Sequence, residues 1–149
     1  MQLTTAARMA RELMNEHGLT DWSLKMDMAK RRFGYCNYRR KTISLSVPLI
    51  QLNGEDEVRD TVLHEIAHAL APGKGHGFMW REKCREIGAR PQRCYSSESV
   101  AEPAAPWVGT AATCGHTLKR FRMSRNSVSC GKCSGGRYNE NYKVTWKRV

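Results

Sequence analysis

The segment TVLHEIAHALAPGKGHGFMW, residues 61–80, holds three of the five histidines of the chain. His64 and His68 are four residues apart, so on a helix their imidazoles project from one face, one turn apart, and can bind the same metal ion. Glu65 lies beside them, within reach of a water molecule at that ion. His76 follows after a short glycine-containing segment that can fold back toward the ion. The spacing therefore predicts a metal site.

Three neutral imidazoles leave one position of a four-coordinate ion for water, which is the open arrangement of catalytic zinc, whereas structural zinc is closed by four protein ligands. We therefore predict one catalytic Zn²⁺ bound by His64, His68 and His76, with Glu65 as the general base. The alternative is a helix that carries solvated or core histidines, because the HExxH pattern alone is short. The oxyanion donor stays unassigned among Tyr35, Tyr95 and the arginine side chains.

The strands that begin near Trp22, the HExxH helix and the sequence HGFMW resemble the SprT-like (Spartan) metalloprotease family from about Leu13 to Cys94. In that family the third ligand lies in a His-Gly motif followed by an aromatic residue, which His76 and Gly77 match. In metzincins the third histidine lies six residues past the second, whereas here the interval is eight. The resemblance implies a zinc endopeptidase that cleaves protein in DNA–protein crosslinks.

SprT-like proteins often carry a zinc ribbon after the protease domain, and the resemblance extends to this part of the chain. Cys130 and Cys133 form a CxxC knuckle. The first knuckle departs from the usual ribbon, because Ala111 and Ala112 stand where a second cysteine is expected. We predict one structural Zn²⁺, a closed site that supplies folding energy, with these ligands: Cys114, His116, Cys130 and Cys133.

The start of the chain has no apolar signal-peptide core, since Arg8, Arg11 and Glu12 interrupt it, and no apolar run is long enough to span a membrane. We expect a protein that is not secreted and has no membrane partner, cytoplasmic or, in a eukaryotic host, nuclear. In such a reducing compartment cysteines need not form disulfides. The cysteines without a partner at ligand spacing are predicted to be small buried hydrophobes: Cys36, Cys84 and Cys94.

Positive charge is concentrated at the C-terminal end. Residues 114–149 contain nine Lys or Arg and one acidic residue, Glu140, out of a net charge of +11 for the chain. A basic block of this density favours nucleic acid over a role in solubility alone. We predict single-stranded or duplex DNA as a partner, with phosphate contacts from six side chains: Lys119, Arg120, Arg122, Arg125, Lys132 and Arg137. The interleaved aromatic residues offer stacking surfaces or pack the ribbon: Phe121, Tyr138, Tyr142 and Trp146.

The elements that position these residues can be read from periodicity and breakers. We predict a helix from Thr4 or Thr5 to Gly18, strands within 22–28, 33–38 and 41–47, the HExxH helix within 52–73, and a helix from His76 to Gly88. Phe78 or Met79, with Cys84 and Ile87, should lie on the buried side of the last helix. A turn is predicted at YRRK, residues 38–41, between the second and third strands.

The predicted fold class is α+β: a small zincin-like domain with an N-terminal helix, a three-stranded antiparallel sheet and two further helices, plus a zinc ribbon. The domains are residues 1–95, a linker at 96–109 and a ribbon at 110–149. The predicted function is that of a monomeric zinc endopeptidase that acts on a protein substrate and that the basic ribbon directs to DNA-associated or DNA-crosslinked proteins. Two alternatives stay open: a nucleic-acid-binding protein with an inactive protease domain, and a zinc peptidase with a dedicated substrate unrelated to DNA.

Overall fold

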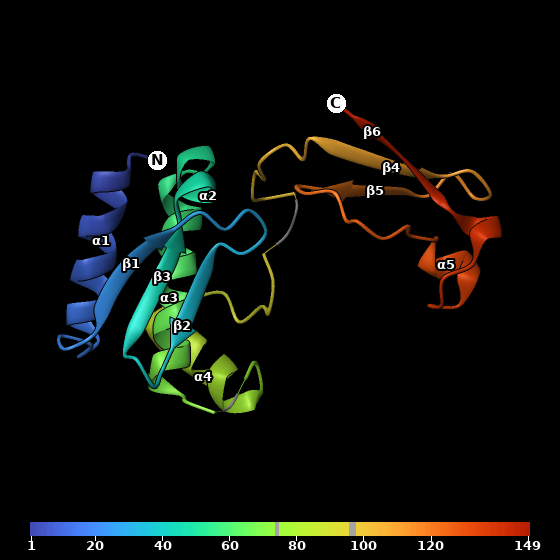
Figure 1. The fold of residues 1–149 in the computed structure, drawn as a ribbon. Coiled ribbons are helices and arrows are strands. Elements are labelled where there is room, and N and C mark those ends of the chain that lie inside the picture. The colour runs from blue at the N-terminus through green and yellow to red at the C-terminus, as the bar shows by residue number, and fades with distance from the viewer. Residues whose placement is uncertain (74, 96–97) are drawn as a thin grey trace. The chain divides into compact units, whose positions relative to one another are not determined.

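The computed structural model describes residues 1–73, 75–95 and 98–149, which form two units, Met1–Pro103 and Ala104–Val149. Residues 96 and 97, where the predicted linker begins, lie outside the described residues. The boundary between the units falls inside the predicted linker, between Pro103 and Ala104. Figure 1 identifies the elements of both units.

The helices of the first unit are α1 (Leu3–Glu16), α2 (Val47–Leu52), α3 (Glu55–Leu70) and α4 (Phe78–Ile87). Three of them lie where the sequence predicts a helix. α3 begins with three acidic residues in its first turn, which the helix dipole favours. α4 ends at Gly88, whose φ of 82° is the left-handed conformation that glycine adopts without strain. The short helix α2 was not predicted; Ser46 caps it by accepting a hydrogen bond from the backbone N–H of Leu49.

The sheet of this unit has the order β1-β3-β2, formed by β1 (Ser23–Asp27), β2 (Gly34–Asn37) and β3 (Thr42–Ser46). The α+β class is confirmed, but the prediction that all three strands are antiparallel is wrong, because β1 runs parallel to β3. β2 and β3 form the antiparallel hairpin, whose turn lies at Tyr38–Lys41. β3 lies at the centre of the sheet, and four of its five residues are buried. β1 and β2 are edge strands of mixed exposure.

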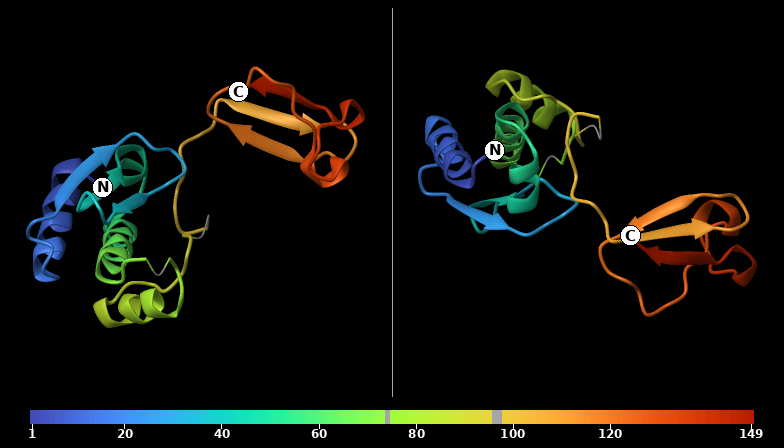
Figure 2. Two further views of the ribbon diagram at one scale, coloured as in Figure 1. Left: turned by 60° about the horizontal axis from the view of Figure 1, so that its bottom comes forward. Right: turned by 90° about the horizontal axis from the view of Figure 1, so that it is seen from above.

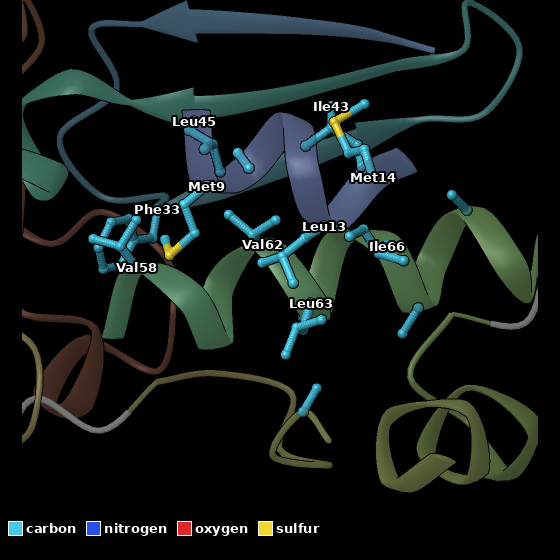
Figure 3. Close-up of a cluster of buried hydrophobic side chains, with 14 of the residues drawn as sticks. Met9, Leu13, Met14, Phe33, Ile43, Leu45, Val58, Val62, Leu63 and Ile66 are labelled. Carbon is cyan, nitrogen blue, oxygen red and sulfur yellow. The ribbon is translucent and has the colours of Figure 1, made fainter. Parts of the chain in front are cut away.

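The core of the first unit lies between the sheet and the helices (Figure 3). Ile43 and Leu45 alternate along β3 and point toward the helices, as the period of two predicts. They meet the apolar stripe of α1 (Met9, Leu13 and Met14) and that of α3 (Val58, Val62 and Ile66). α3 is thereby buried on most of its surface, which gives the residues that it carries a rigid support.

The chain after α4 packs back onto the first unit. We call the described residues 89–95 and 98–103 the strap. Val100 is buried in the core, and Ala101 exchanges two hydrogen bonds with the side chain of Asn53, at 2.7 and 2.9 Å. The Tyr95 ring meets Phe33 edge to face, with centroids 6.2 Å apart. The strap therefore belongs to the first unit, although its composition is that of a linker.

The second unit contains a three-stranded antiparallel sheet with the order β5-β4-β6 (Figure 2), formed by β4 (Trp107–Ala111), β5 (Thr117–Arg120) and β6 (Val144–Arg148). The turn helices α5 (Gly131–Ser134) and η1 (Glu140–Tyr142) complete it. Its core is small: Ala111, Cys130 and Val144, with four half-buried neighbours. A core of this size needs a further staple to be stable.

The orientation of α4 differs in part from the prediction. Trp80 and Cys84 are its buried residues, whereas the side chains of Phe78 and Met79 are exposed and Ile87 is half-buried. The expectation of a buried Phe78 or Met79 is therefore wrong, because the larger indole two positions later fills that side of the helix. Among the described residues no helix has the length and apolar character needed to cross a membrane.

Candidate active site and metal centres

Two elements bring the three histidines together. α3 carries His64 and His68 one turn apart on its half-buried side. His76 lies between α3 and α4, after a turn in which Gly73 and Gly75 have φ values of 72° and 52°. Positive φ is accessible to glycine without strain, so this short segment can reverse direction and return His76 to the HExxH face. The predicted ligands thus converge on one point.

The geometry of the three Nε2 atoms fits a metal ion. His76 Nε2 is 3.0 Å from His68 Nε2 and 3.2 Å from His64 Nε2. A tetrahedral zinc ion about 2.0–2.1 Å from each nitrogen would hold its nitrogens about 3.3 Å apart. Burial lowers the pKa of His64 to about 3 and that of His68 to about 4, and it also lowers the pKa of His76. Neutral imidazoles, the form that binds metal, are therefore favoured.

Trp80 supports all three imidazoles. Its side chain is fully buried, and its ring centroid lies 4.7 Å from that of His64, 5.2 Å from that of His68 and 4.6 Å from that of His76. Its Nε1 is buried without a hydrogen-bond partner in the described part of the chain. Trp80 is the last residue of the HGFMW motif, and no role was predicted for it; its position four residues after His76, one helical turn away, is the signal in the sequence.

Glu65, the predicted base, is buried on the side of α3 that faces β2. Burial raises its pKa to about 8, an effect that the positive charge of Arg32 partly offsets. The backbone of β2 approaches closely: a Cβ at Gly34 would lie 2.6 Å from Glu65 Oε1 and 2.7 Å from its Cγ. The missing side chain at Gly34 therefore leaves the room that Glu65 occupies, a contact that the sequence analysis did not predict.

A cleft of about 670 Å³ opens above the histidines within the first unit. Its walls are the segment from Arg31 through β2, the C-terminal half of α3 and the strap. Tyr35 and Tyr95, both considered as oxyanion donors, line this cleft. The hydroxyl of Tyr95 is 3.2 Å from Glu102 Oε1 and 3.4 Å from the carbonyl oxygen of Arg31, so its proton already has partners. Tyr35 is exposed, with the Arg32 guanidinium 4.8 Å from its ring centroid.

The second unit contains a cluster of three sulfur atoms. The Sγ atoms of Cys114, Cys130 and Cys133 all lie within 4.8 Å of one another, and those of Cys114 and Cys130 are 3.6 Å apart. A tetrahedral zinc ion about 2.3 Å from each sulfur would hold them about 3.8 Å apart, so this cluster also fits the metal. His116, predicted as the fourth ligand, is not part of this cluster. Its backbone carbonyl accepts a hydrogen bond from Ala111.

The other three cysteines have different surroundings. Cys84 is buried in the core, as predicted. Cys36 is half-buried on β2, and its burial, together with the charge of Glu65, raises its pKa to about 12. Cys94 is exposed in the strap, so the expectation of a buried side chain is wrong there. None of these thiols forms a disulfide.

The residues predicted to contact DNA lie in the second unit, mostly exposed: Lys119, Arg120, Arg122, Arg125, Lys132 and Arg137. Two further basic residues of this unit, Lys147 and Arg148, were not among the predicted contacts; β6 places them beside Val108 and Trp107 of β4. Tyr142 and Trp146 pack against the small core, whereas Tyr138 is 52% exposed. The Arg120 guanidinium lies 4.8 Å from the Trp146 ring centroid.

The fold and the first site together define a class. A helix with HExxH, a third histidine from a returning turn and a buried glutamate beside a cleft are the parts of a zinc metallopeptidase. A model of the SprT-like family matches residues 5–99, and the chain belongs to this family. The chain is thus a zinc metalloprotease with zinc as its cofactor.

Two solved structures of metallopeptidase zymogens resemble part of the chain. Jannalysin from Methanocaldococcus jannaschii is 16% identical, covering 54% of this chain and 79% of its own, with a TM-score of 0.49. Abylysin from Pyrococcus abyssi is 17% identical, covering 55% of this chain and 78% of its own, with a TM-score of 0.47. No curated protein is significantly similar to the chain in sequence.

Proposed function

We propose that the chain is a monomeric zinc-dependent endopeptidase whose second unit directs it to proteins bound or crosslinked to DNA. The observation that carries this proposal is that the peptidase residues and the concentrated positive charge lie in different units. The first unit holds the peptidase residues, and the second holds nine basic side chains against one acidic residue. A unit of that charge concentrates on polyanions, so it can bring the cleft to protein that lies on DNA.

The hydrolytic step follows from the residues around the cleft. His64, His68 and His76 would hold the zinc ion, which would supply a Lewis acid for the peptide carbonyl and lower the pKa of water toward neutrality. Glu65 takes a proton from that water, and the same carboxyl group delivers it to the leaving amine. Trp80 holds the imidazoles from below, and the backbone at Gly34 fixes the position of the Glu65 side chain.

The charge of the second unit is not neutralised internally. Glu140, its single acidic residue, makes an ion pair with Lys143 at 2.8 Å and also contacts Tyr138. One sheet face carries Lys119 and Lys147 on either side of Val108, and the other carries Arg120 and Arg148 on either side of Trp107. Cations of this kind can contact the phosphates of a single-stranded or duplex nucleic acid, and exposed rings can stack on its bases.

A second zinc ion, held by Cys114, Cys130 and Cys133, stabilises this unit in our proposal. The distances within the cluster support it, and so does the size of the core, since three buried hydrophobic side chains hold little free energy of folding. The metal has a structural role here because the cluster lies in a different unit from the cleft.

The test is a cleavage assay with and without DNA. The wild type should cleave a DNA-binding protein faster when single- or double-stranded DNA is present, while cleavage of a short peptide without affinity for DNA should not change. Glu65→Gln, which keeps the size of the side chain but removes the base, should retain zinc and lose peptide hydrolysis by on the order of a hundredfold or more.

Each half of the proposal has its own contrary result. Full peptide hydrolysis by Glu65→Gln would show that Glu65 is not the base. Equal cleavage of the DNA-binding protein with and without DNA would show that the second unit recruits the enzyme to something other than DNA, as for a peptidase with a dedicated substrate.

A further inference from the structure

The two turns that carry the sulfur cluster have the same backbone design. In the second turn, the carbonyl of Cys130 accepts a hydrogen bond from the backbone N–H of Ser134, four residues later, at 2.9 Å. In the first turn, the carbonyl of Ala111 accepts one from the N–H of Gly115, also four residues later, at 2.8 Å. A glycine with positive φ lies at the end of each turn: Gly115 (66°), four residues after Ala111, and Gly135 (63°), five residues after Cys130. The two turns therefore share the hydrogen bond that closes them, from the N–H of the fourth residue to the carbonyl of the first.

This equivalence pairs the residues of the two turns. Cys133, three residues after Cys130, corresponds to Cys114, three residues after Ala111. Ala111 therefore stands where the first turn would carry its other sulfur ligand. Its surroundings agree, because Ala111 is fully buried in one cluster with Cys130 and Cys133, whereas the next residue, Ala112, is exposed. The methyl group of Ala111 packs in the cluster but offers no donor atom.

We propose that the metal centre of the second unit is a three-thiolate site whose fourth ligand position, at Ala111, is vacant on the protein side and is filled by an exchangeable small donor. Water is the resident ligand in this proposal, and imidazole or a thiol can replace it. His116 is not the fourth ligand, since it is not part of the sulfur cluster. The inference rests on the proposal above that these cysteines bind a metal ion.

The chemistry of the donors has two consequences. Three thiolates keep the preference for a soft or borderline ion such as zinc, so metal selectivity is retained. An open position makes the ion easier to remove than in a site closed by four protein ligands, because a competing ligand can enter before any thiolate leaves. The centre therefore resembles a catalytic site in its openness while its place in the fold is structural.

Cobalt substitution in the full chain tests this inference. Thiolate-to-cobalt charge transfer absorbs in the near ultraviolet and grows with the number of thiolates, and the histidine site does not contribute to it. His68→Ala serves as the background for all variants, so that the peptidase centre does not bind cobalt tightly. Ala111→Cys should raise the charge-transfer intensity by about a third, from three thiolates to four, and should slow zinc loss to a chelator by on the order of tenfold.

Two matched variants and one added ligand complete the experiment. Ala112→Cys places the same thiol one residue away, on an exposed position, and should change neither quantity. His116→Ala should leave the cobalt spectrum and the metal content unchanged. Added imidazole should shift the cobalt ligand-field bands in the parent and leave them unchanged in Ala111→Cys.

The contrary results are distinct. A change of the cobalt spectrum or a loss of metal in His116→Ala would make His116 the fourth ligand and overturn the inference, as would an Ala111→Cys variant that behaves like Ala112→Cys. If the parent shows no charge-transfer band at all, the three cysteines bind no metal and the proposed second zinc is wrong. None of these outcomes bears on peptide hydrolysis, which depends on the other unit.

Discussion

Glu65 is buried on α3, and this burial raises its pKa to about 8. A raised pKa makes the carboxylate a stronger base, as the proposed removal of a proton from water requires. Its position depends on Gly34, whose missing side chain leaves room for the carboxylate on the face of β2 that packs against α3. The position of the Glu65 carboxylate therefore depends on the absence of a side chain at Gly34.

We predict that Gly34→Ala lowers peptide hydrolysis by on the order of tenfold to a hundredfold while zinc content stays unchanged. The added methyl group would lie 2.6 Å from Glu65 Oε1, so the carboxylate must move away, and a displacement of about 1 Å is enough for such a loss. Steady-state kinetics with a fluorogenic peptide and metal analysis measure the two quantities.

Gly54→Ala is the matched control for this substitution. Gly54 precedes α3 with a φ of −80°, and a Cβ there would meet no atom within 4 Å, so its activity should stay near the wild-type value. Equal losses in both variants would mean that the Gly34 effect comes from general destabilisation. An unchanged rate in Gly34→Ala would show that Glu65 tolerates displacement.

Among the elements, α4 contributes to the active site without supplying a ligand. It begins two residues after His76, and its residue Trp80 lies against the rings of all three histidines. The helix thus joins the third ligand to the two on α3 through one aromatic side chain. Packing against this ring restricts the orientations of the imidazoles and so prearranges them for a metal ion.

Trp80→Ala should destabilise the first unit by about 3–5 kcal/mol, because it opens a cavity under the histidines, and it should weaken zinc binding. Trp80→Phe keeps an aromatic ring and removes the N–H that lacks a partner, so it should retain most of the stability and the zinc. Thermal unfolding with and without zinc, and competition with a chelator, measure both effects.

Phe78→Ala tests whether the effect is specific to the ring below the site. Phe78 belongs to the same helix but is 73% exposed, so its removal should change neither stability nor zinc affinity by much. Should Trp80→Ala bind zinc as tightly as the wild type, the indole would be a core residue without influence on the metal centre.

For the whole molecule, the boundary between Pro103 and Ala104 separates the unit that holds the peptidase residues from the unit in which the positive charge is concentrated. The strap lies on the peptidase side and lines the cleft, so a cut at the start of the predicted linker would remove part of the active-site wall. A cut after Trp107 would leave a residue of β4 behind. The structure therefore indicates that truncation should follow Pro103.

Truncation after Pro103 should abolish most DNA binding and leave hydrolysis of short peptides intact. For the full chain, neutralising about five phosphates predicts that log affinity falls with log salt with a slope of about −3.5 for single strands and about −4.5 for duplex. Fluorescence anisotropy with labelled DNA over a range of salt concentrations measures the slope.

Single substitutions check where the contacts lie. Arg122→Gln, on the exposed surface of the second unit, should reduce the magnitude of the slope by about one, whereas Arg8→Gln, exposed on α1 of the first unit, should not change it. If the truncated chain binds DNA with the affinity and slope of the full chain, the second unit is not the DNA-binding element.

The parts of the site that depend on local spacing could be predicted from the sequence. His64 and His68 fall on one face because a helix repeats every 3.6 residues, and Cys130 and Cys133 fall in one turn because they are three residues apart. The strands, the long helices and the basic block could be predicted for the same reason, since alternation, acidic first turns and glycine stops act within a few neighbouring residues.

The features that depend on contacts distant in the chain come from the tertiary structure. Periodicity shows neither which strand is central nor in which direction its neighbours run, and here β3 lies between the two edge strands with β1 parallel to it. Gly34 lies against Glu65, which is 31 positions away in the sequence. Val100 is buried, so part of the predicted linker packs onto the first unit, where the strap lines the cleft. Ala111, not His116, lies with the sulfur atoms because two backbone turns, 19 residues apart, bring equivalent positions together.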